Sequence, residues 1–541
     1  MMLRQADSDP VAESQMDGSS PILSVERLTV ALPKGADRQL AVENASLDLR
    51  RGEILCIVGE SGSGKSALSG AIMGAPAPGL TVTGGSVRLQ GKEITTLSER
   101  AWCRIRGNRI AMIFQEPMAA LNPAVPVGRQ IMEVFELHAR MSRAQRRERA
   151  FELIRSMQLP DPERIAASYP HQLSGGQCQR VIIAMALAMN PEVLIADEPT
   201  TALDVTTQAQ VLKLIRDLRT VHGHAILFIT HDFGVVAEIA DRIAVMRHGR
   251  IVEIGAARQV LTQPAHPYTR ELIAAVPSLT PPPAVLSPVT NPVLSVTGLK
   301  KSYGSVRAVN EISFELERGT TLSVVGESGC GKSSLARLIV RLTQPTSGRV
   351  EVNGKCYLSL RHGELRSSCR AVQMIFQDPF GSLNPLRRVG ATVERAAILA
   401  GADRRTARAR AAELFDRIGL PREAMDRRPA AFSGGQKQRI GIARALAMNP
   451  DVLIADESLS ALDASSQAQI IELLRKLQND LGLAILMITH DLRVAAQISH
   501  RIAVMQAGKI VEIGPAARVI NSPEHPYTRE LLDAAPGRGL V

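Results

Sequence analysis

The chain has 541 residues, of which 45% are hydrophobic and 22% are charged, a composition that fits two globular domains of roughly 250 residues each. No apolar run approaches the roughly 18 residues that a membrane helix requires, and the six cysteines lack CxxC spacing, which argues against a disulfide framework or a structural zinc site. A net charge of +11 is compatible with binding either to nucleic acid or to an anionic membrane surface, so charge alone does not identify a partner.

The predicted organisation is a flexible tail (1–20), a first domain (21–275), a linker (276–292) and a second domain (293–541). The tail carries four acidic side chains and no apolar stretch, so we expect no secretory signal and a protein that stays in the reducing cytoplasm. Six prolines in the linker favour an extended connector, which at about 3.1 Å per residue spans roughly 50 Å. Such a linker lets the two domains face each other.

The first distinctive element is a glycine-rich loop that follows a predicted strand, Ile54 to Val58, and opens a predicted helix. Its pattern, GxxxxGKS, directs backbone N–H groups and the helix N-terminus toward phosphate oxygens. Lys65 is placed to reach the outer phosphates and Ser66 to ligate Mg²⁺. The loop residues that we expect at a bound ATP are Gly59, Ser61, Gly62, Gly64, Lys65 and Ser66.

Two later apolar runs, Val193 to Ala196 and Ala225 to Ile229, end in candidate functional residues. The first leads into Asp197 and Glu198, of which the aspartate suits the Mg²⁺ shell and the glutamate is placed to polarise the water that cleaves the γ-phosphate. The alternative, solvated turn residues, is less favoured because the phosphate loop lies upstream. Continuous apolar strands that end at a ligand site predict a buried parallel sheet with helices on both faces.

Arginine-rich stretches from Ser142 to Met157 and from Arg404 to Ile418 predict helices. A solvated basic face is the favoured interpretation, so these charges receive no functional role.

The whole series returns in the second half of the chain in the same order. Lys65 and Lys332 are 267 residues apart, whereas Asp197 and Asp456 are 259 apart, as are the histidines that follow the third strand, His231 and His490. A near-constant offset over so long a stretch indicates a tandem domain duplication. The second copy comprises Gly326, Ser328, Gly329, Gly331, Lys332, Ser333, Asp456, Glu457 and His490.

A Ser-Gly-Gly-Gln segment stands 23 residues before each Asp-Glu pair. With these segments the chain resembles the ATP-binding subunits of ABC transporters, whose signature motif has the same sequence and the same position relative to the Asp-Glu pair. The resemblance implies two tandem P-loop NTPase domains, each with a mostly parallel core sheet, an antiparallel β subdomain and a helical subdomain. It also implies that each signature caps the γ-phosphate held by the opposite domain, so that one site combines Lys65 with Ser433 and the other Lys332 with Ser174. The signature residues are Ser174, Gly175, Gly176, Gln177, Ser433, Gly434, Gly435 and Gln436.

Three further pairs match the family's motifs. The resemblance implies Q-loop glutamines that sense Mg²⁺ and water, switch histidines that contact the γ-phosphate and orient the glutamates, and D-loop aspartates that cross the interface. These pairs are Gln115 and Gln377, His231 and His490, and Asp204 and Asp463. The implied catalytic residues are therefore Glu198, Glu457, His231 and His490, and the implied metal-site residues are Ser66, Gln115, Asp197, Ser333, Gln377 and Asp456.

The two domain tails, 266–272 and 525–531, share the sequence HPYTREL and resemble the C-terminal motif of the peptide, opine and nickel importer branch. We therefore expect a fused ATPase subunit of the dipeptide, oligopeptide or glutathione type. Physically the motif is also compatible with a proline-tyrosine turn that only packs on its domain. Some relatives in this branch bind an iron-sulfur cluster beyond this motif, but no cysteine follows Cys369, so we expect none here.

The adenine contact differs between the two copies. Tyr303 stands where the family usually places an aromatic residue that stacks on adenine, and the equivalent position in the first copy is Leu32. Loss of one aromatic contact is worth roughly 1 kcal/mol, so we expect looser ATP binding at the Lys65 site.

The resemblance implies an ATPase, with ATP and Mg²⁺ as cofactors, at the cytoplasmic face of the inner membrane. Its expected partners are two permeases, non-identical because the ATPase halves differ, and an extracytoplasmic solute-binding protein, with no nucleic acid. A soluble tandem ABC ATPase acting on ribosomes or DNA is the alternative, which the short linker and the absence of CxxC disfavour. An exporter is a third possibility, which the HPY tails disfavour. Dipeptides, oligopeptides, glutathione, opines and nickel all remain open as solutes.

Overall fold

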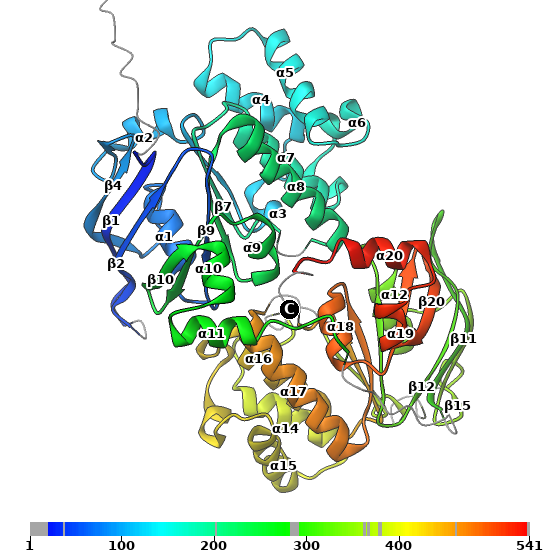
Figure 1. Cartoon of the computed structure of the whole chain (residues 1–541). Coiled ribbons are helices and arrows are strands. Elements are labelled where there is room, and N and C mark those ends of the chain that lie inside the picture. Colours follow the sequence, from blue (N-terminus) through cyan, green and yellow to red (C-terminus); the bar gives the residue numbers. More distant parts are fainter. Residues whose placement is uncertain are drawn as a thin grey trace, which may run out of the picture.

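The computed structural model describes residues 20–35, 38–200, 203–281, 292–360, 364, 368–376, 381–459 and 462–537. These residues form two halves of the same architecture, each with a small antiparallel sheet, a larger mostly parallel sheet and a group of helices (Figure 1). The predicted fold class is thereby confirmed. Most of the predicted linker, 282–291, lies outside the described residues.

The small sheet of each half is antiparallel and buries one face. Its order is β2-β1-β4-β5 in the first half and β12-β11-β14-β15 in the second. In β2 and β12, buried and more exposed residues largely alternate, as expected for a sheet with one face on the core. The strands are β1 (Leu23–Ala31), β2 (Leu40–Leu49), β4 (Thr81–Leu89), β5 (Lys92–Glu93), β11 (Pro292–Tyr303), β12 (Val306–Glu317), β14 (Ser347–Val352) and β15 (Lys355–Cys356).

The larger sheet is parallel except for one antiparallel edge strand. The order is β10-β9-β3-β8-β7-β6 in the first half, and β20-β19-β13-β18-β17-β16 repeats it in the second. Every residue of β3, β7 and β8 is buried, which explains their continuous apolar sequences. The strands are β3 (Ile54–Val58), β6 (Ile110–Ile113), β7 (Val193–Asp197), β8 (Ala225–Thr230), β9 (Arg242–Arg247), β10 (Arg250–Ala256), β13 (Thr321–Val325), β16 (Val372–Ile375), β17 (Val452–Asp456), β18 (Ala484–Thr489), β19 (Arg501–Gln506) and β20 (Lys509–Pro515).

Helices cover both faces of each large sheet, and a separate helical group stands at its outer end (Figure 1). The outer group contains α4 to α6 in the first half and α14 and α15 in the second, so the two predicted basic helices are α5 and α15. The first-half helices are α1 (Lys65–Ile72), α2 (Glu99–Ile105), α3 (Pro117–Ala120), α4 (Val127–His138), α5 (Arg143–Ser156), α6 (Pro162–Ala167), η1 (Pro170–Gln172), α7 (Gly175–Leu187), α8 (Val205–His222), α9 (Phe233–Ile239), α10 (Ala257–Thr262) and α11 (Pro267–Ala274). The second-half helices are α12 (Lys332–Ile339), α14 (Val389–Leu399), α15 (Arg404–Arg417), η2 (Arg422–Asp426), η3 (Pro429–Ala431), α16 (Gly434–Leu446), α17 (Ala464–Leu481), α18 (Leu492–Ile498), α19 (Ala516–Asn521) and α20 (Pro526–Asp533).

The parallel strands deliver the candidate functional residues to one edge of each sheet. The phosphate loop follows β3, Asp197 ends β7, and His231 follows β8. Because the carboxyl ends of parallel strands lie at the same edge, residues far apart in sequence meet there. The same holds for β13, β17 and β18 in the second half.

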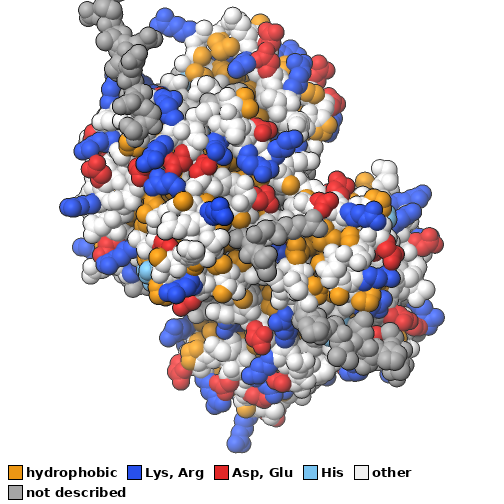
Figure 2. Space-filling view, viewed as in Figure 1, with side chains coloured by type: hydrophobic (Ala, Val, Ile, Leu, Met, Phe, Trp, Pro, Cys, Tyr) orange, Lys and Arg blue, Asp and Glu red, His pale blue; other side chains and the backbone are white. Residues whose placement is uncertain are grey.

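The two halves also share a small apolar cluster. Val205, at the start of α8, belongs to a buried cluster whose other members, such as Leu492 and Ala535, come from the second half. On the face shown in Figure 2, basic and acidic side chains are interspersed and do not gather into one basic patch. In the part of the chain that the structure describes, no helix is both long and apolar enough to cross a membrane.

Candidate nucleotide sites at the seam between the halves

Both phosphate loops adopt a backbone that requires glycine. Gly64 has φ of 107°, and a Cβ there would lie 2.3 Å from the carbonyl oxygen of Ala41; the equivalent Gly331 has φ of 110°. The lysine that follows each of these glycines begins a helix, and Lys65 Nζ donates to the carbonyl oxygens of Gly59 at 2.7 Å and Glu60 at 3.0 Å. The two predicted loops therefore have the same shape, with a buried lysine at a helix N-terminus.

A serine hydroxyl and an aspartate carboxylate meet beside each lysine. Ser66 Oγ lies 3.3 Å from Asp197 Oδ1, and Ser333 Oγ lies 3.0 Å from Asp456 Oδ1. Burial raises the pKa of both aspartates above the ordinary value. A hydroxyl and a carboxylate oxygen are ligands that suit Mg²⁺, so this donor set fits the predicted metal site.

The glutamates Glu198 and Glu457 occupy the left-handed region of the backbone, with φ of 46° and 44°. Such a conformation is unusual for a side-chain-bearing residue and is found preferentially at functional sites. In the first half, Gln115 Nε2 donates to Glu198 Oε2 at 2.9 Å, and His231 Nδ1 lies 3.3 Å from the same oxygen. The structure thus brings together the predicted glutamine, glutamate and histidine of this half.

The second half brings the equivalent histidine and glutamate together at a longer distance. His490 Nδ1 lies 3.8 Å from Glu457 Oε1, and Lys332 Nζ lies 3.9 Å from the same oxygen. Burial opposes the charged carboxylate, but the histidine and the lysine together lower the pKa of Glu457 below its ordinary value. Gln377, the counterpart of Gln115, lies outside the described residues.

Each signature segment caps a helix. Ser174 precedes α7 and accepts from the N–H of Gln177 at 3.2 Å, and Ser433 precedes α16 in the same way. Gly176 and Gly435 lie against the start of the next long helix, since a Cβ on Gly176 would lie 2.6 Å from Thr207 Cγ2. Among the described residues no hydrogen bond joins Ser174 or Ser433 to the opposite phosphate loop. Pairing of each signature with the opposite lysine therefore stays a prediction.

The D-loop aspartates do lie at the seam between the halves. Asp463 caps α17 and also accepts from the N–H of Ser61, in the phosphate loop of the other half, at 3.3 Å. Next to it, Ser465 donates to Glu60 Oε1 at 2.7 Å. Each phosphate loop is thus met by the start of the long helix from the opposite half.

The second seam contact is made by residues to which no sequence motif gives a role. Thr206 Oγ1 lies within hydrogen-bond distance of Glu327 Oε1, at 2.7 Å, and of Asp204 Oδ1, at 2.8 Å, so its one proton is available to either carboxylate. Glu60 and Glu327 occupy the same position of the two phosphate loops, and Thr206 and Ser465 occupy the same position after the two D-loops. The only sequence signal was that a hydrogen-bonding side chain recurs at both positions in both copies.

The tail motifs reach the phosphate loops. The hydroxyl of Tyr268 accepts from the N–H of Glu60 at 3.3 Å, and that of Tyr527 accepts from the N–H of Glu327 at 3.2 Å. The two rings are 3% and 5% exposed. Each HPY tail therefore contacts its own phosphate loop by a hydrogen bond.

The predicted adenine contacts lie at the end of the small sheets. Tyr303 ends β11, its side chain is 48% exposed, and Lys301 Nζ lies 5.1 Å from the ring centre. Leu32 is partly buried against the core of the first half. In that half Arg38 donates to the carbonyl oxygen of Gly62 in the phosphate loop at 2.6 Å, a contact that the sequence did not indicate. The stacking role of Tyr303 stays a prediction.

Two protein-family models match the segments that form these sites and the tails. The family described as "ABC transporter" matches residues 42–201 and 309–460, which include the phosphate loops, the signatures and the Asp-Glu strands. The chain belongs to the ABC transporter ATP-binding family. It is therefore an ATPase, and its two halves are ABC ATPase domains. A second model, "Oligopeptide/dipeptide transporter, C-terminal region", matches residues 252–303 and 511–538 and so covers both HPY tails.

Curated relatives match nearly the whole chain. Proteins named "Glutathione import ATP-binding protein GsiA" from Shigella boydii serotype 4 (strain Sb227) and from Escherichia coli (strain K12) are each 45% identical over 95% of this chain and 89% of their own length. Among solved structures, a dimeric ATP-binding cassette, MJ0796, bound to ADP and Pi is 31% identical and covers 44% of this chain and 99% of that chain, with a TM-score of 0.40.

Proposed function

We propose that this ABC ATPase binds two ATP molecules with Mg²⁺ in composite sites at the seam and uses their hydrolysis to drive solute import. The observation that carries the proposal is the pair of contacts across the seam, Ser465 to Glu60 and Thr206 to Glu327. They place each phosphate loop against the helix that packs on the opposite signature. A small closing movement would then bring each signature over the opposite loop, as the sequence predicts.

The site residues have distinct roles in this proposal. Lys65 and Lys332 bind the outer phosphates, while the signature helix N-termini, with their capping serines, stabilise the γ-phosphate of the opposite site. Bound Mg²⁺, held beside Ser66 with Asp197 and beside Ser333 with Asp456, would neutralise phosphate charge. Glu198 and Glu457 orient the attacking water, and the neighbouring histidines hold these carboxylates in place. The strained backbone of both glutamates is explained if their position at the water matters more than local stability.

ATP supplies the closing energy because its γ-phosphate would contact both halves at once. Cleavage removes this shared contact, so the halves separate and the cycle can repeat. Covalent linkage of the halves makes closure intramolecular and raises the effective concentration of each half for the other. We take the domain bounds of 21–275 and 293–541 as the units that move.

An importer ATPase works with membrane permeases and a solute-binding protein. We propose that the partners here are two non-identical permeases and one extracytoplasmic binding protein, and that the chain lies at the cytoplasmic face of the inner membrane. The solute is a peptide-like molecule, and glutathione is the first to test because relatives with that named role match along both halves. Uptake of labelled glutathione and of a labelled dipeptide by vesicles that contain the reconstituted complex would identify it. A Lys65→Ala/Lys332→Ala variant is the control.

The composite arrangement of the sites can be tested by combining two site substitutions in one chain. In a Glu198→Gln/Glu457→Gln background, which retains ATP, Lys65→Ala with Ser433→Ala damages one composite site, whereas Lys65→Ala with Ser174→Ala damages both. We expect one retained ATP per chain for the first pair and little for the second, measured after rapid gel filtration. The reverse order would show that each half completes its own site and would reject the proposal.

A further inference from the structure

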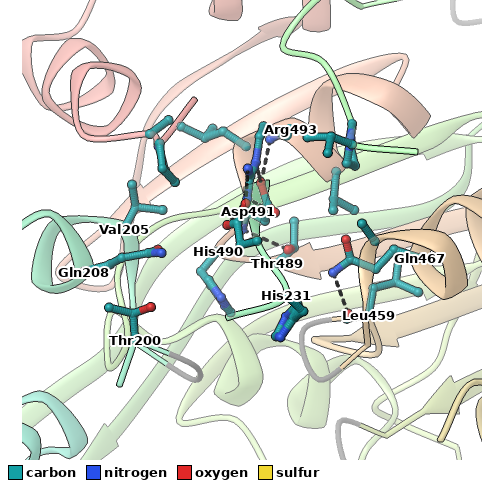
Figure 3. A pocket seen from close by; sticks show the side chains of 18 of the residues that line it. Thr200, Val205, Gln208, His231, Leu459, Gln467, Thr489, His490, Asp491 and Arg493 are labelled. Atoms are coloured by element: carbon teal, nitrogen blue, oxygen red, sulfur yellow. Dashed lines mark hydrogen bonds and ion pairs between the residues drawn. The ribbon is translucent and has the colours of Figure 1, made fainter. Parts of the chain in front are cut away.

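The two halves carry different residues at one position of the turn after the switch histidine that proves important at the seam. In the second half His490 is followed by Asp491, Leu492 and Arg493, whereas the position equivalent to Arg493 in the first half is Gly234. This difference lies at the seam, where both turns line one pocket of about 80 Å³ (Figure 3).

Arg493 joins the two halves through both aspartates. Its Nη1 and Nη2 donate to the two oxygens of Asp232, in the first half, at 2.9 and 2.8 Å. Its Nε and Nη2 donate to Asp491 of its own turn, each at 3.2 Å. One guanidinium thus serves two carboxylates, and the contact to Asp232 has the bidentate geometry that arginine favours.

The bridge is shielded from solvent. The side chain of Arg493 is 11% exposed, and those of Asp232 and Asp491 are 20% and 21% exposed. Burial opposes ionisation of Asp232, but the charge of Arg493 lowers the pKa of this carboxyl below its ordinary value. Removal of the arginine would therefore leave two like charges without their cation in a partly buried site, which is costly.

Gly234 provides the space that the bridge needs. A Cβ at this position would lie 2.5 Å from Arg493 Nη1 and 3.0 Å from the carbonyl oxygen of Pro536. A contact below 3 Å forces one partner to move, so a larger residue at 234 would displace the guanidinium. Glycine in the first half and arginine in the second are thus complementary parts of one contact.

The two aspartates also shape the turns of the switch histidines. Asp232 accepts from the N–H of Gly234 at 2.8 Å and its own N–H donates to Thr230 Oγ1 at 3.0 Å. Asp491 makes the same two bonds in the second half, to Arg493 and Thr489. Figure 3 shows Arg493, Asp491 and His490 together, with His231 across the same pocket. A shift of either turn is therefore transmitted to the other turn through the side chain of Arg493.

We propose that Arg493 is a positioning residue that couples the two ATP sites by tying the turn after His231 to the turn after His490. The bridge involves no phosphate-binding residue, so it does not depend on which site holds nucleotide. When one site hydrolyses ATP, its histidine moves and shifts the neighbouring aspartate. Arg493 transmits that shift to the turn of the other half. The proposal rests on the composite sites described above and adds that they do not act independently.

The test compares ATP hydrolysis by four versions of the assembled permease complex: the natural chain, Glu457→Gln, Arg493→Met and the double variant. If the sites are coupled through Arg493, Glu457→Gln lowers turnover of the natural chain well below half, by roughly fivefold or more. In the Arg493→Met background the same change leaves about half of the turnover, because the first site then works alone. Inability of the natural chain to hydrolyse ATP would instead reject the proposed function itself.

Three further variants separate coupling between the sites from general damage to the protein. Gly234→Ala keeps every charge but displaces the guanidinium, so it should also release the coupling, whereas Arg493→Lys should retain part of it. Arg422→Met removes an exposed ion pair to Asp416 within one half and should leave the natural response to Glu457→Gln unchanged. If Glu457→Gln leaves half of the turnover in the natural chain, or if the fivefold loss persists in both Arg493→Met and Gly234→Ala, Arg493 does not couple the sites.

Discussion

The hydroxyl of Tyr527 accepts a hydrogen bond from the backbone N–H of Glu327 at 3.2 Å, across 200 residues of sequence. Glu327 in turn accepts from Thr206 of the opposite half through its carboxylate. The C-terminal tail, the phosphate loop and the opposite D-loop thus form one continuous set of contacts. The first half repeats it with Tyr268, Glu60 and Ser465.

Removal of either tail hydroxyl should therefore weaken ATP binding at its own site. Tyr527→Phe keeps the buried ring but leaves the N–H of Glu327 without this acceptor, a loss of about 1 kcal/mol that corresponds to a roughly fivefold rise in Kd for ATP. Nucleotide titration of the variant with the first site disabled by Lys65→Ala measures the effect. Tyr268→Phe, which removes the equivalent hydroxyl beside the phosphate loop of the disabled first site, is the matched control. An unchanged Kd would mean that the tail packs on the domain without supporting the loop.

Replacement of the strained glutamates should separate hydrolysis from closure. Glu198→Gln and Glu457→Gln each preserve side-chain shape but remove the charge that orients water, so turnover at the affected site should fall at least tenfold, by roughly 1.4 kcal/mol or more. ATP-stabilised closure should survive, as measured by cross-linking across the seam. Normal hydrolysis by the double variant would show that neither glutamate acts on the water.

An aromatic residue at position 32 should improve the first site. Leu32→Tyr restores the side chain type that Tyr303 provides in the second half, and a stacking contact is worth roughly 1 kcal/mol, or about a fivefold tighter Kd. Titration of a Lys332→Ala background isolates this site. The same affinity before and after the change would reject adenine stacking at the end of β1.

The pair of His231 and Glu198 should make stability depend on pH in a defined direction. Burial alone would lower the pKa of His231, but the hydrogen bond and the charge of Glu198, together with Asp232, raise it above the ordinary value of 6.5. A raised folded pKa contributes stability that is fully present below 6.5 and is lost as pH rises through the folded pKa. The difference in unfolding temperature between the natural chain and His231→Gln should therefore be larger at about pH 5.5 than at about pH 8.5. A difference that grows with pH would contradict the charge assignment.

Much of each half was predictable because its motifs are local. A phosphate loop such as 59–66 contains its own glycines, lysine and helix start, so eight consecutive residues indicate both the backbone and the ligand. The strands β3, β7 and β8 were equally clear, since full burial requires continuous apolar sequence. Duplication strengthened each of these predictions, because a chance match is not repeated at a constant offset.

The contacts across the seam could not be predicted in the same way. Nothing local in Ser465 or Thr206 distinguishes a seam residue from an ordinary helix start. Gly234 and Arg493 stand out only once the two halves face each other, because the missing side chain of one makes room for the guanidinium of the other. The sequence by itself determined two ATPase domains and indicated the candidate residues of their sites, since those depend on short-range pattern. Only the tertiary structure decided how the domains meet, because that depends on which surfaces, hundreds of residues apart, fit in shape and charge.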